Sequence, residues 1–162
     1  MKRVFFIIFI LALLILPVRA EVLTVGVSIE DVPDALFGSW RVVAKLDETN
    51  AYHTFKPQSV DIWNLSRAGD ILTLNNPFTG AKADISIKAV EGNLIVFSKK
   101  APYDNKILTD TVSIRLDNGK FSGINALTLE SYSLIDNHLM KTETARYLIK
   151  GEKISGENVL KQ

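Results

Sequence analysis

Apolar and polar residues alternate in short segments along the chain from about residue 38 onward. Residues 40–46, 84–89 and 110–116 show this most clearly, because every second residue there is apolar or small. A period of two is typical of β-strands that bury one face. No long segment of this part of the chain has helical periodicity. The pattern therefore predicts an all-β domain.

Turn-forming residues separate the alternating segments. Asp117-Asn118-Gly119 is the strongest signal, because Asn and Gly tolerate the positive φ that tight hairpins require. The expected strands cover residues 40–46, 60–66, 71–74, 84–89, 93–98, 110–116, 121–129 and 142–150, and residues 75–80 and 99–107 are expected to form longer loops.

About eight sequential strands with mostly short loops predict a single antiparallel up-and-down β-barrel, because closure removes exposed strand edges. The same pattern permits a β-sandwich, and the sequence leaves both architectures open. A closed barrel requires the apolar faces to point inward. The inward residues expected in two of the strands are Ile85, Ile87 and Ala89, and Val112, Ile114 and Leu116.

The first twenty residues have the layout of a secretory signal peptide. A basic start is followed by the 13 apolar residues 4–16, then by Pro17 and by Val18-Arg19-Ala20, which fits cleavage after Ala20. About 20 apolar residues are needed to span a bilayer, so this run is short for an anchor. We expect a signal peptide at 1–20, a periplasmic or secreted product, and no membrane span after cleavage.

The remaining chain is expected to divide into an N-terminal segment, 21–36, and a barrel domain, 37–162. Residues 30–36 predict one short helical turn, with Asp31 as its N-cap and Pro33 in its first turn. Such a turn could plug one end of a barrel.

The charge and the cysteine content limit the classes of function that the chain can have. Removing residues 1–20 leaves 16 basic against 18 acidic residues, so no basic excess favours nucleic acid. The chain has no Cys, which excludes disulfides and thiolate metal sites. An exported domain without disulfides is typical of bacterial periplasmic proteins.

Gly38-Ser39-Trp40, at the start of the first expected strand, resembles the Gly-x-Trp block of lipocalins and related calycins. The resemblance covers about residues 35–150. It implies that Trp40 packs across the closed end of the barrel against an Arg from the last strand, and Arg146 occupies the matching place. Gly38, Trp40 and Arg146 are therefore expected to form the barrel floor, with a cation–π contact between the last two.

A second block is similar only in part. Thr109-Asp110 matches two residues of the family's Thr-Asp-Tyr block, but Thr111 stands where the Tyr would be. The chain also shows no helix after the last expected strand. For function, the resemblance implies binding of a small apolar ligand inside the barrel.

The sequence contains few residues that could form a catalytic or metal-binding site. The two histidines, His53 and His138, fall in expected loops, and a metal site would need both of them and a carboxylate. No Gly-x-Ser-x-Gly nucleophile elbow is present. We expect no enzyme activity, no metal and no cofactor.

Aromatic side chains are the better candidates for a binding site, above all Phe55, Trp63, Phe97 and Tyr132. They either line a cavity or fill it, because an eight-stranded barrel is just wide enough for side chains or for one small ligand. Two functions follow: an exported binder of a small apolar ligand, or a protein-interaction module, such as an inhibitor or envelope assembly factor, with a filled barrel. A continuous cavity of about 300 Å³ or more favours the binder.

Overall fold

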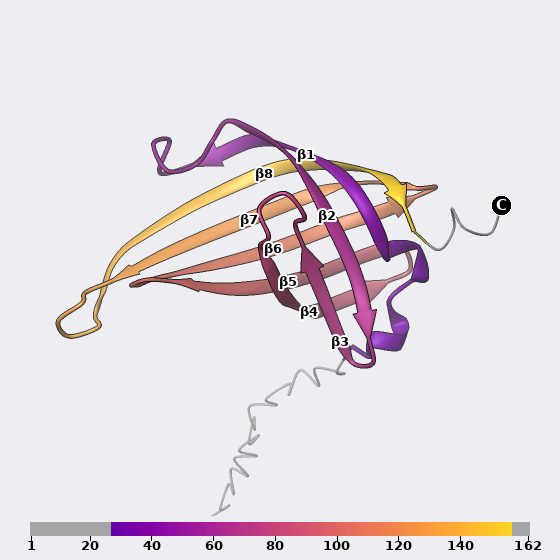
Figure 1. Ribbon diagram of the computed structural model, residues 1–162. Coiled ribbons are helices and arrows are strands. Elements are labelled where there is room, and N and C mark those ends of the chain that lie inside the picture. Colours follow the sequence, from indigo (N-terminus) through magenta and orange to yellow (C-terminus); the bar gives the residue numbers. More distant parts are fainter. Residues whose placement is uncertain (1–26, 157–162) are drawn as a thin grey trace, which may run out of the picture.

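Eight antiparallel strands form one closed barrel in the computed structural model, which describes residues 27–156 (Figure 1). The strands are β1 Gly38–Thr49, β2 Gln58–Ala68, β3 Ile71–Asn75, β4 Lys82–Glu91, β5 Leu94–Tyr103, β6 Lys106–Asp117, β7 Lys120–Tyr132 and β8 Leu139–Ser155. Each pairs with the next along the chain, and β8 pairs with β1. The predicted up-and-down barrel is therefore confirmed, and the sandwich is excluded.

The predicted signal peptide, 1–20, lies outside the described residues. Within residues 27–156, no helix has both the length and the apolar character needed to cross a bilayer.

Two short 3₁₀ turns, η1 Ile29–Asp31 and η2 Asp34–Leu36, precede β1. Ser28, not Asp31, is the N-cap of η1, because its hydroxyl accepts from the Glu30 N–H and the Asp31 carboxylate accepts from the Ser28 N–H. The single helical turn expected with Asp31 as its cap is thus corrected. Leu36 is fully buried, so this segment closes one end of the barrel.

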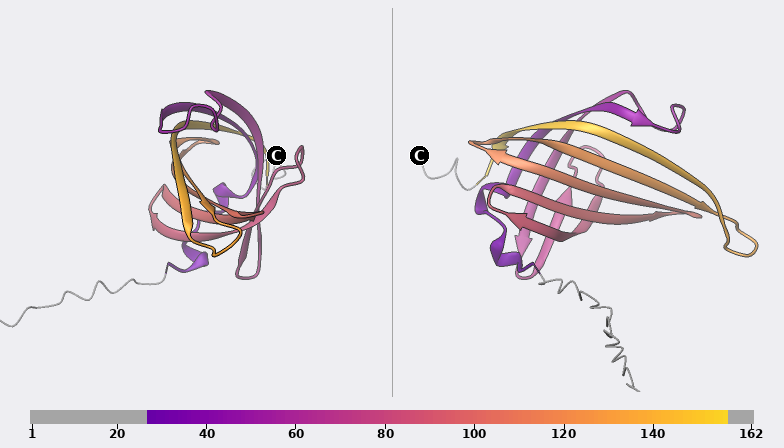
Figure 2. Two further views of the ribbon diagram at one scale, coloured as in Figure 1. Left: turned by 90° about the vertical axis from the view of Figure 1, so that its left-hand side faces the viewer. Right: turned by 180° about the vertical axis from the view of Figure 1, so that it is seen from behind.

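The strands differ greatly in length, from five residues in β3 to 17 in β8, and β5 to β8 extend beyond β3 and β4, with the β7–β8 hairpin projecting furthest (Figure 2). The prediction of a long loop at 99–107 is wrong. β5 runs on to Tyr103 and β6 begins at Lys106, so the two strands form one continuous hairpin. Lys99 occupies an inward position there, and this polar residue hides the period-two pattern.

A β-bulge changes which residues of β4 face the interior. Ile87 pairs with Phe97 but Ala89 pairs with Val96, so Lys88 is an extra residue. Ala89 consequently shares the outward face of Val96, and Val90 packs against the core in its place. The prediction that Ala89 faces inward is wrong, whereas the inward positions of Ile85, Ile87, Val112, Ile114 and Leu116 are confirmed.

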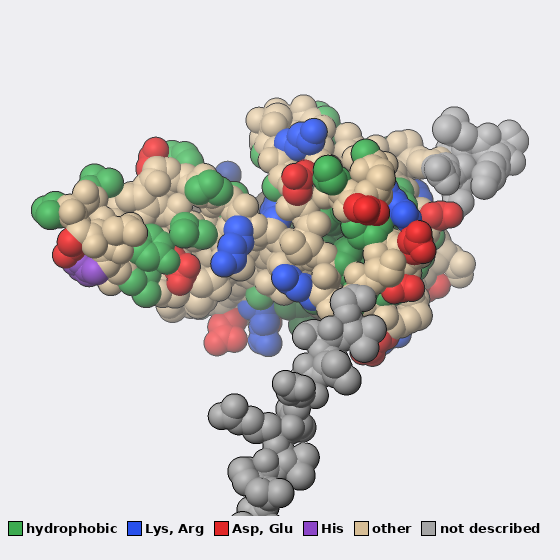
Figure 3. Space-filling view, turned by 90° about the horizontal axis from the view of Figure 1, so that it is seen from below, with side chains coloured by type: hydrophobic (Ala, Val, Ile, Leu, Met, Phe, Trp, Pro, Cys, Tyr) green, Lys and Arg blue, Asp and Glu red, His purple; other side chains and the backbone are tan. Residues whose placement is uncertain are grey.

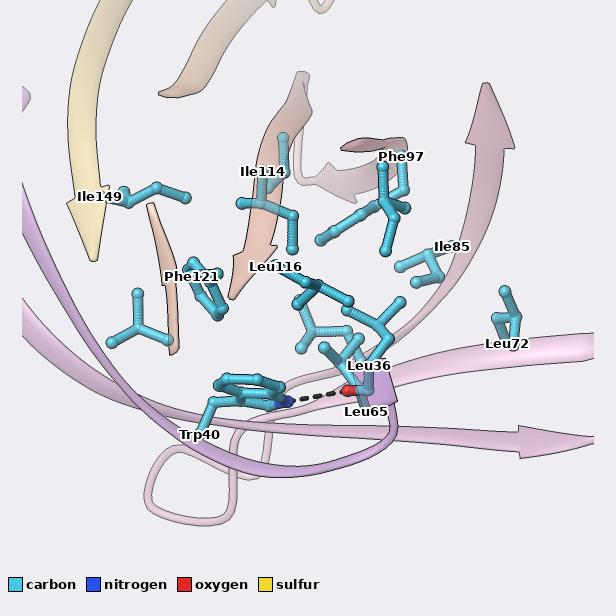
Figure 4. Close-up of a cluster of buried hydrophobic side chains, with 14 of the residues drawn as sticks. Leu36, Trp40, Leu65, Leu72, Ile85, Phe97, Ile114, Leu116, Phe121 and Ile149 are labelled. Carbon is cyan, nitrogen blue, oxygen red and sulfur yellow. Dashed lines mark hydrogen bonds between the residues drawn. The ribbon is translucent and has the colours of Figure 1, made fainter. Parts of the chain in front are cut away.

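The closed end of the barrel is tightly packed around Trp40, which is 1% exposed (Figure 4). Its ring centroid lies 5.0 Å from that of Phe121, and its Nε1 donates a 2.8 Å hydrogen bond to the Leu36 carbonyl. Gly38, just before it, has φ +124°, and a Cβ there would lie 2.2 Å from the Ser155 carbonyl oxygen. These contacts join the N-terminal plug, β1 and β8 into one floor.

The cation above Trp40 is Lys153, not Arg146. Lys153 Nζ lies 5.4 Å from the Trp40 ring centroid and donates to the Ala35 carbonyl at 2.8 Å. Arg146 instead pairs with Asp47 at 2.6 Å on the outside. The predicted Arg146 contact failed because β8 continues beyond residue 150, where it was expected to end, so that Lys153 lies beside Trp40 in the ladder. Arg146 falls on the outward face between buried Ala145 and Tyr147.

Candidate ligand-binding cavity

The other end of the barrel is hollow. A cavity of about 520 Å³ lies on the side of the β1–β2 and β3–β4 loops. Its larger apolar lining residues are Val42, Phe55, Trp63, Leu74, Leu108 and Leu127. Trp63 separates it from the packed end, since its ring lies 6.5 Å from Phe97 and 6.0 Å from Phe121. The interior is therefore filled at one end and open at the other.

Two of the four aromatic residues expected at a binding site line this cavity. Phe55 and Trp63 do so, whereas Phe97 is 1% exposed and belongs to the packed core beneath Trp63. Tyr132 is at the end of β7, where its hydroxyl contacts Glu130 at 3.2 Å. It is not part of the cavity wall, because β7 extends past the rim of the barrel.

The loop that carries Phe55 is tied to β8 by two hydrogen bonds. The Tyr147 hydroxyl donates to the Lys56 carbonyl at 2.9 Å, and the Thr54 hydroxyl donates to Glu143 Oε1 at 2.8 Å. Phe55 itself is 8% exposed and belongs to the hydrophobic cluster of the interior. These bonds hold the β1–β2 loop against one side of the cavity.

A polar cluster in the wall was not anticipated from the sequence. Lys99, Asp110 and Asn125 come from β5, β6 and β7, and all three side chains line the cavity. Lys99 Nζ lies 3.3 Å from Asp110 Oδ2, and Asn125 Nδ2 donates to Asp110 Oδ1. The register opposes Lys99 and Asp110 directly. The sequence feature that could have indicated this cluster is Asp110, which lies two residues before Val112 on an otherwise apolar face of the strand.

The opposite wall carries a second carboxylate–amide pair. Asn76 Nδ2 donates to Asp61 Oδ1 at 2.9 Å, and both residues line the cavity. Lys56 and Lys82 complete its charged lining. Polar and apolar side chains therefore share the lining of the hollow end, whereas the core cluster beneath Trp63 is apolar.

Burial raises the pKa of Asp110 above its ordinary value of 3.8, and the smaller effects of Lys99 and Asn125 oppose this rise. The folded protein consequently binds a proton at Asp110 more readily than the unfolded chain does. Removing two charges from water has a desolvation cost that their attraction often fails to offset. The Lys99–Asp110 pair is therefore a poor stabiliser of the barrel.

This shift predicts a specific pH dependence for Asp110→Asn. The contribution of Asp110 to the free energy of unfolding should fall as pH rises from 3.8 to its higher folded pKa, because the unfolded chain loses its proton first. The wild-type free energy of unfolding minus that of the variant should therefore decrease over this window. Urea unfolding at a series of pH values measures the difference. A difference that increases with pH would show that the attraction of Lys99 outweighs burial.

The histidines do not contribute to the cavity. His53 is exposed in the β1–β2 loop, and His138 Nδ1 lies 2.6 Å from Asp136 in the β7–β8 loop. Among residues 27–156, no three His, Asp or Glu side chains are placed to hold a metal ion.

No family model matches this chain, and neither a curated protein nor a solved structure does. The lipocalin resemblance thus stays a prediction that rests on Gly38-Ser39-Trp40 and on the partial Thr109-Asp110 match.

Proposed function

We propose that this chain is an exported, lipocalin-like carrier of a small and largely apolar molecule, which occupies the hollow end of the barrel. The observation that carries the proposal is the cavity of about 520 Å³. This volume lies within the range of roughly 300–1,000 Å³ that is usual for small-molecule sites. Export rests on the predicted signal peptide.

The residues around the cavity suit such a ligand. The indole ring of Trp63 forms the bottom of the cavity. The small side chains of Ala44, Ala83 and Ala101 in its wall leave room for a ligand. The packed end holds Trp63 in place through Phe97 and Phe121. Because the site is largely preformed, little ordering would oppose binding.

One feature favours the alternative function, a protein-interaction module. The β7–β8 hairpin ends in apolar side chains that contact water, with Leu134 88% and Ile135 98% exposed. Hydrophobic side chains gather at this projecting end of the molecule (Figure 3). Exposed apolar patches often mark interaction sites. An interaction module of that kind requires a filled barrel, however, and this barrel is hollow at one end.

A cavity-filling substitution tests the carrier proposal. Ala101→Trp would place a large ring in the cavity and should weaken binding of the neutral fluorescent probe N-phenyl-1-naphthylamine by at least about tenfold, a change of about 1.4 kcal/mol. Fluorescence titration measures the affinity, and circular dichroism checks the fold.

Lys100→Trp is the matched control, because Lys100 precedes Ala101 on β5 and is exposed. Its probe affinity should equal that of the wild type. If the wild type does not bind the probe, or if both variants bind as the wild type does, the carrier proposal is wrong and the interaction module becomes the better account.

A further inference from the structure

The cavity lining has more positive than negative side chains, and the two kinds differ in how many partners they have inside the protein. Three lysines, Lys56, Lys82 and Lys99, face two aspartates, Asp61 and Asp110. Each aspartate already accepts a hydrogen bond from an Asn side chain, and Asp110 has Lys99 beside it as well. Each aspartate therefore has at least one partner inside the protein.

The lysine ammonium groups have fewer partners inside the protein than the aspartates do. Within residues 27–156, the Lys56 and Lys82 ammonium groups have neither an ion pair nor a hydrogen bond. Lys99 has one charged neighbour, at 3.3 Å, although an ammonium group has three N–H donors. Its side chain is 26% exposed, so part of it remains open to the cavity.

Lys99 places a charge directly above the apolar core. Lys99 is the next inward residue after buried Phe97 on β5, on the hollow side of the Trp63–Phe97 contact. A ligand with its apolar body against Trp63 could therefore reach Lys99 with one polar end. The attraction between an ammonium and an anion is stronger in a site partly removed from water than in bulk water.

We infer that the ligand is an amphiphile with an anionic head group, and that Lys99 Nζ binds this head group while the apolar body lies against Trp63. The inference rests on the proposed carrier function. The anion gives Lys99 a second acceptor beside Asp110. Lys82 and Lys56 add positive charge around the cavity.

Competition among ligands of one chain length tests the inference. Dodecanoic acid, dodecyl phosphate, 1-dodecanol and dodecylamine would each displace N-phenyl-1-naphthylamine from the purified protein at pH 7.5. The acid or the phosphate should bind at least about tenfold more tightly than the alcohol, the gain expected for one charge-assisted hydrogen bond. The better of the two anions distinguishes a carboxylate from a phosphate head group.

Substitutions then assign the preference to Lys99. Lys99→Met should abolish the preference for the anion and leave binding of 1-dodecanol unchanged, whereas Lys100→Met, on the outside of the same strand, should change neither. The double variant Lys99→Met/Asp110→Asn leaves no lone buried carboxylate, and it should behave as Lys99→Met does if that variant folds poorly.

Three results would overturn the inference. They are equal binding of the acid, the phosphate and the alcohol, tightest binding of the amine, and an anion preference that survives in both Lys99 variants. In each of these cases the neutral probe still binds, so the carrier proposal stands. A wild-type protein that binds neither the probe nor any of the four compounds would overturn both.

Discussion

Trp40→Ala is expected to lower the free energy of unfolding by about 3–5 kcal/mol, the range for deleting a large buried aromatic side chain. Trp40 is 1% exposed, packs against Phe121 and donates to the Leu36 carbonyl, so the substitution leaves a cavity and an unpaired acceptor in the floor of the barrel. Urea unfolding followed by circular dichroism measures the loss.

Tyr52→Ala serves as the control, because Tyr52 is 75% exposed and its removal should change the free energy of unfolding by no more than about 0.5 kcal/mol. A loss below about 1 kcal/mol for Trp40→Ala would mean that the floor does not depend on the indole ring.

A double-mutant cycle distinguishes Lys153 from Arg146 as the cationic partner of Trp40. Trp40→Ala and Lys153→Ala should couple by at least about 0.5 kcal/mol, because Lys153 Nζ lies 5.4 Å from the ring centroid. Trp40→Ala and Arg146→Ala should be additive, since Arg146 pairs with Asp47 on the outer surface. The opposite result would restore the Arg146 contact that the lipocalin resemblance implies.

Ile114→Asp should prevent the chain from accumulating as a folded protein. Ile114 lies in the middle of β6 and is fully buried, so the substitution places a carboxylate without a partner in the apolar core. The cost of several kcal/mol is comparable to the whole stability of a small domain, about 5–15 kcal/mol. Soluble yield and far-ultraviolet circular dichroism are the measurements.

The control for this substitution adds the same charge outside the barrel. Ser122→Asp is exposed on β7, between Arg115 of β6 and Lys150 of β8, so its carboxylate meets cations and water. Stability should change by no more than about 0.5 kcal/mol. Loss of folding in both variants would argue against the inward and outward faces described for β6 and β7.

The fold could be predicted from the sequence because period-two alternation is a local signal. Val112, Ile114 and Leu116 all point inward, as their spacing implies. The signal fails where an inward position is polar, as at Lys99, and where one extra residue changes the phase, as at Lys88. The sequence of a single segment does not reveal that a polar residue points inward or that a strand contains a bulge.

The candidate site was predictable only in part, for a different reason. Aromatic residues are common both in cores and in pockets, and spacing alone does not say at which level of the barrel a residue lies. Register decides this: it puts Phe97 beneath Trp63 and sets Lys99 opposite Asp110. Such pairings join strands at a distance in the sequence, so they follow from the closed sheet and not from a single segment.

Pairing of β1 with β8 has a consequence for the order in which the protein can fold. Ser39 pairs with Ser155, so the first strand of the barrel meets its second neighbour only after the last strand has been synthesised. Long-range pairing of this kind slows folding to the range of milliseconds to seconds. Until then, β1 keeps one open edge that can pair with other chains. Pairing of β8 with β1 therefore removes the last open edge of the sheet.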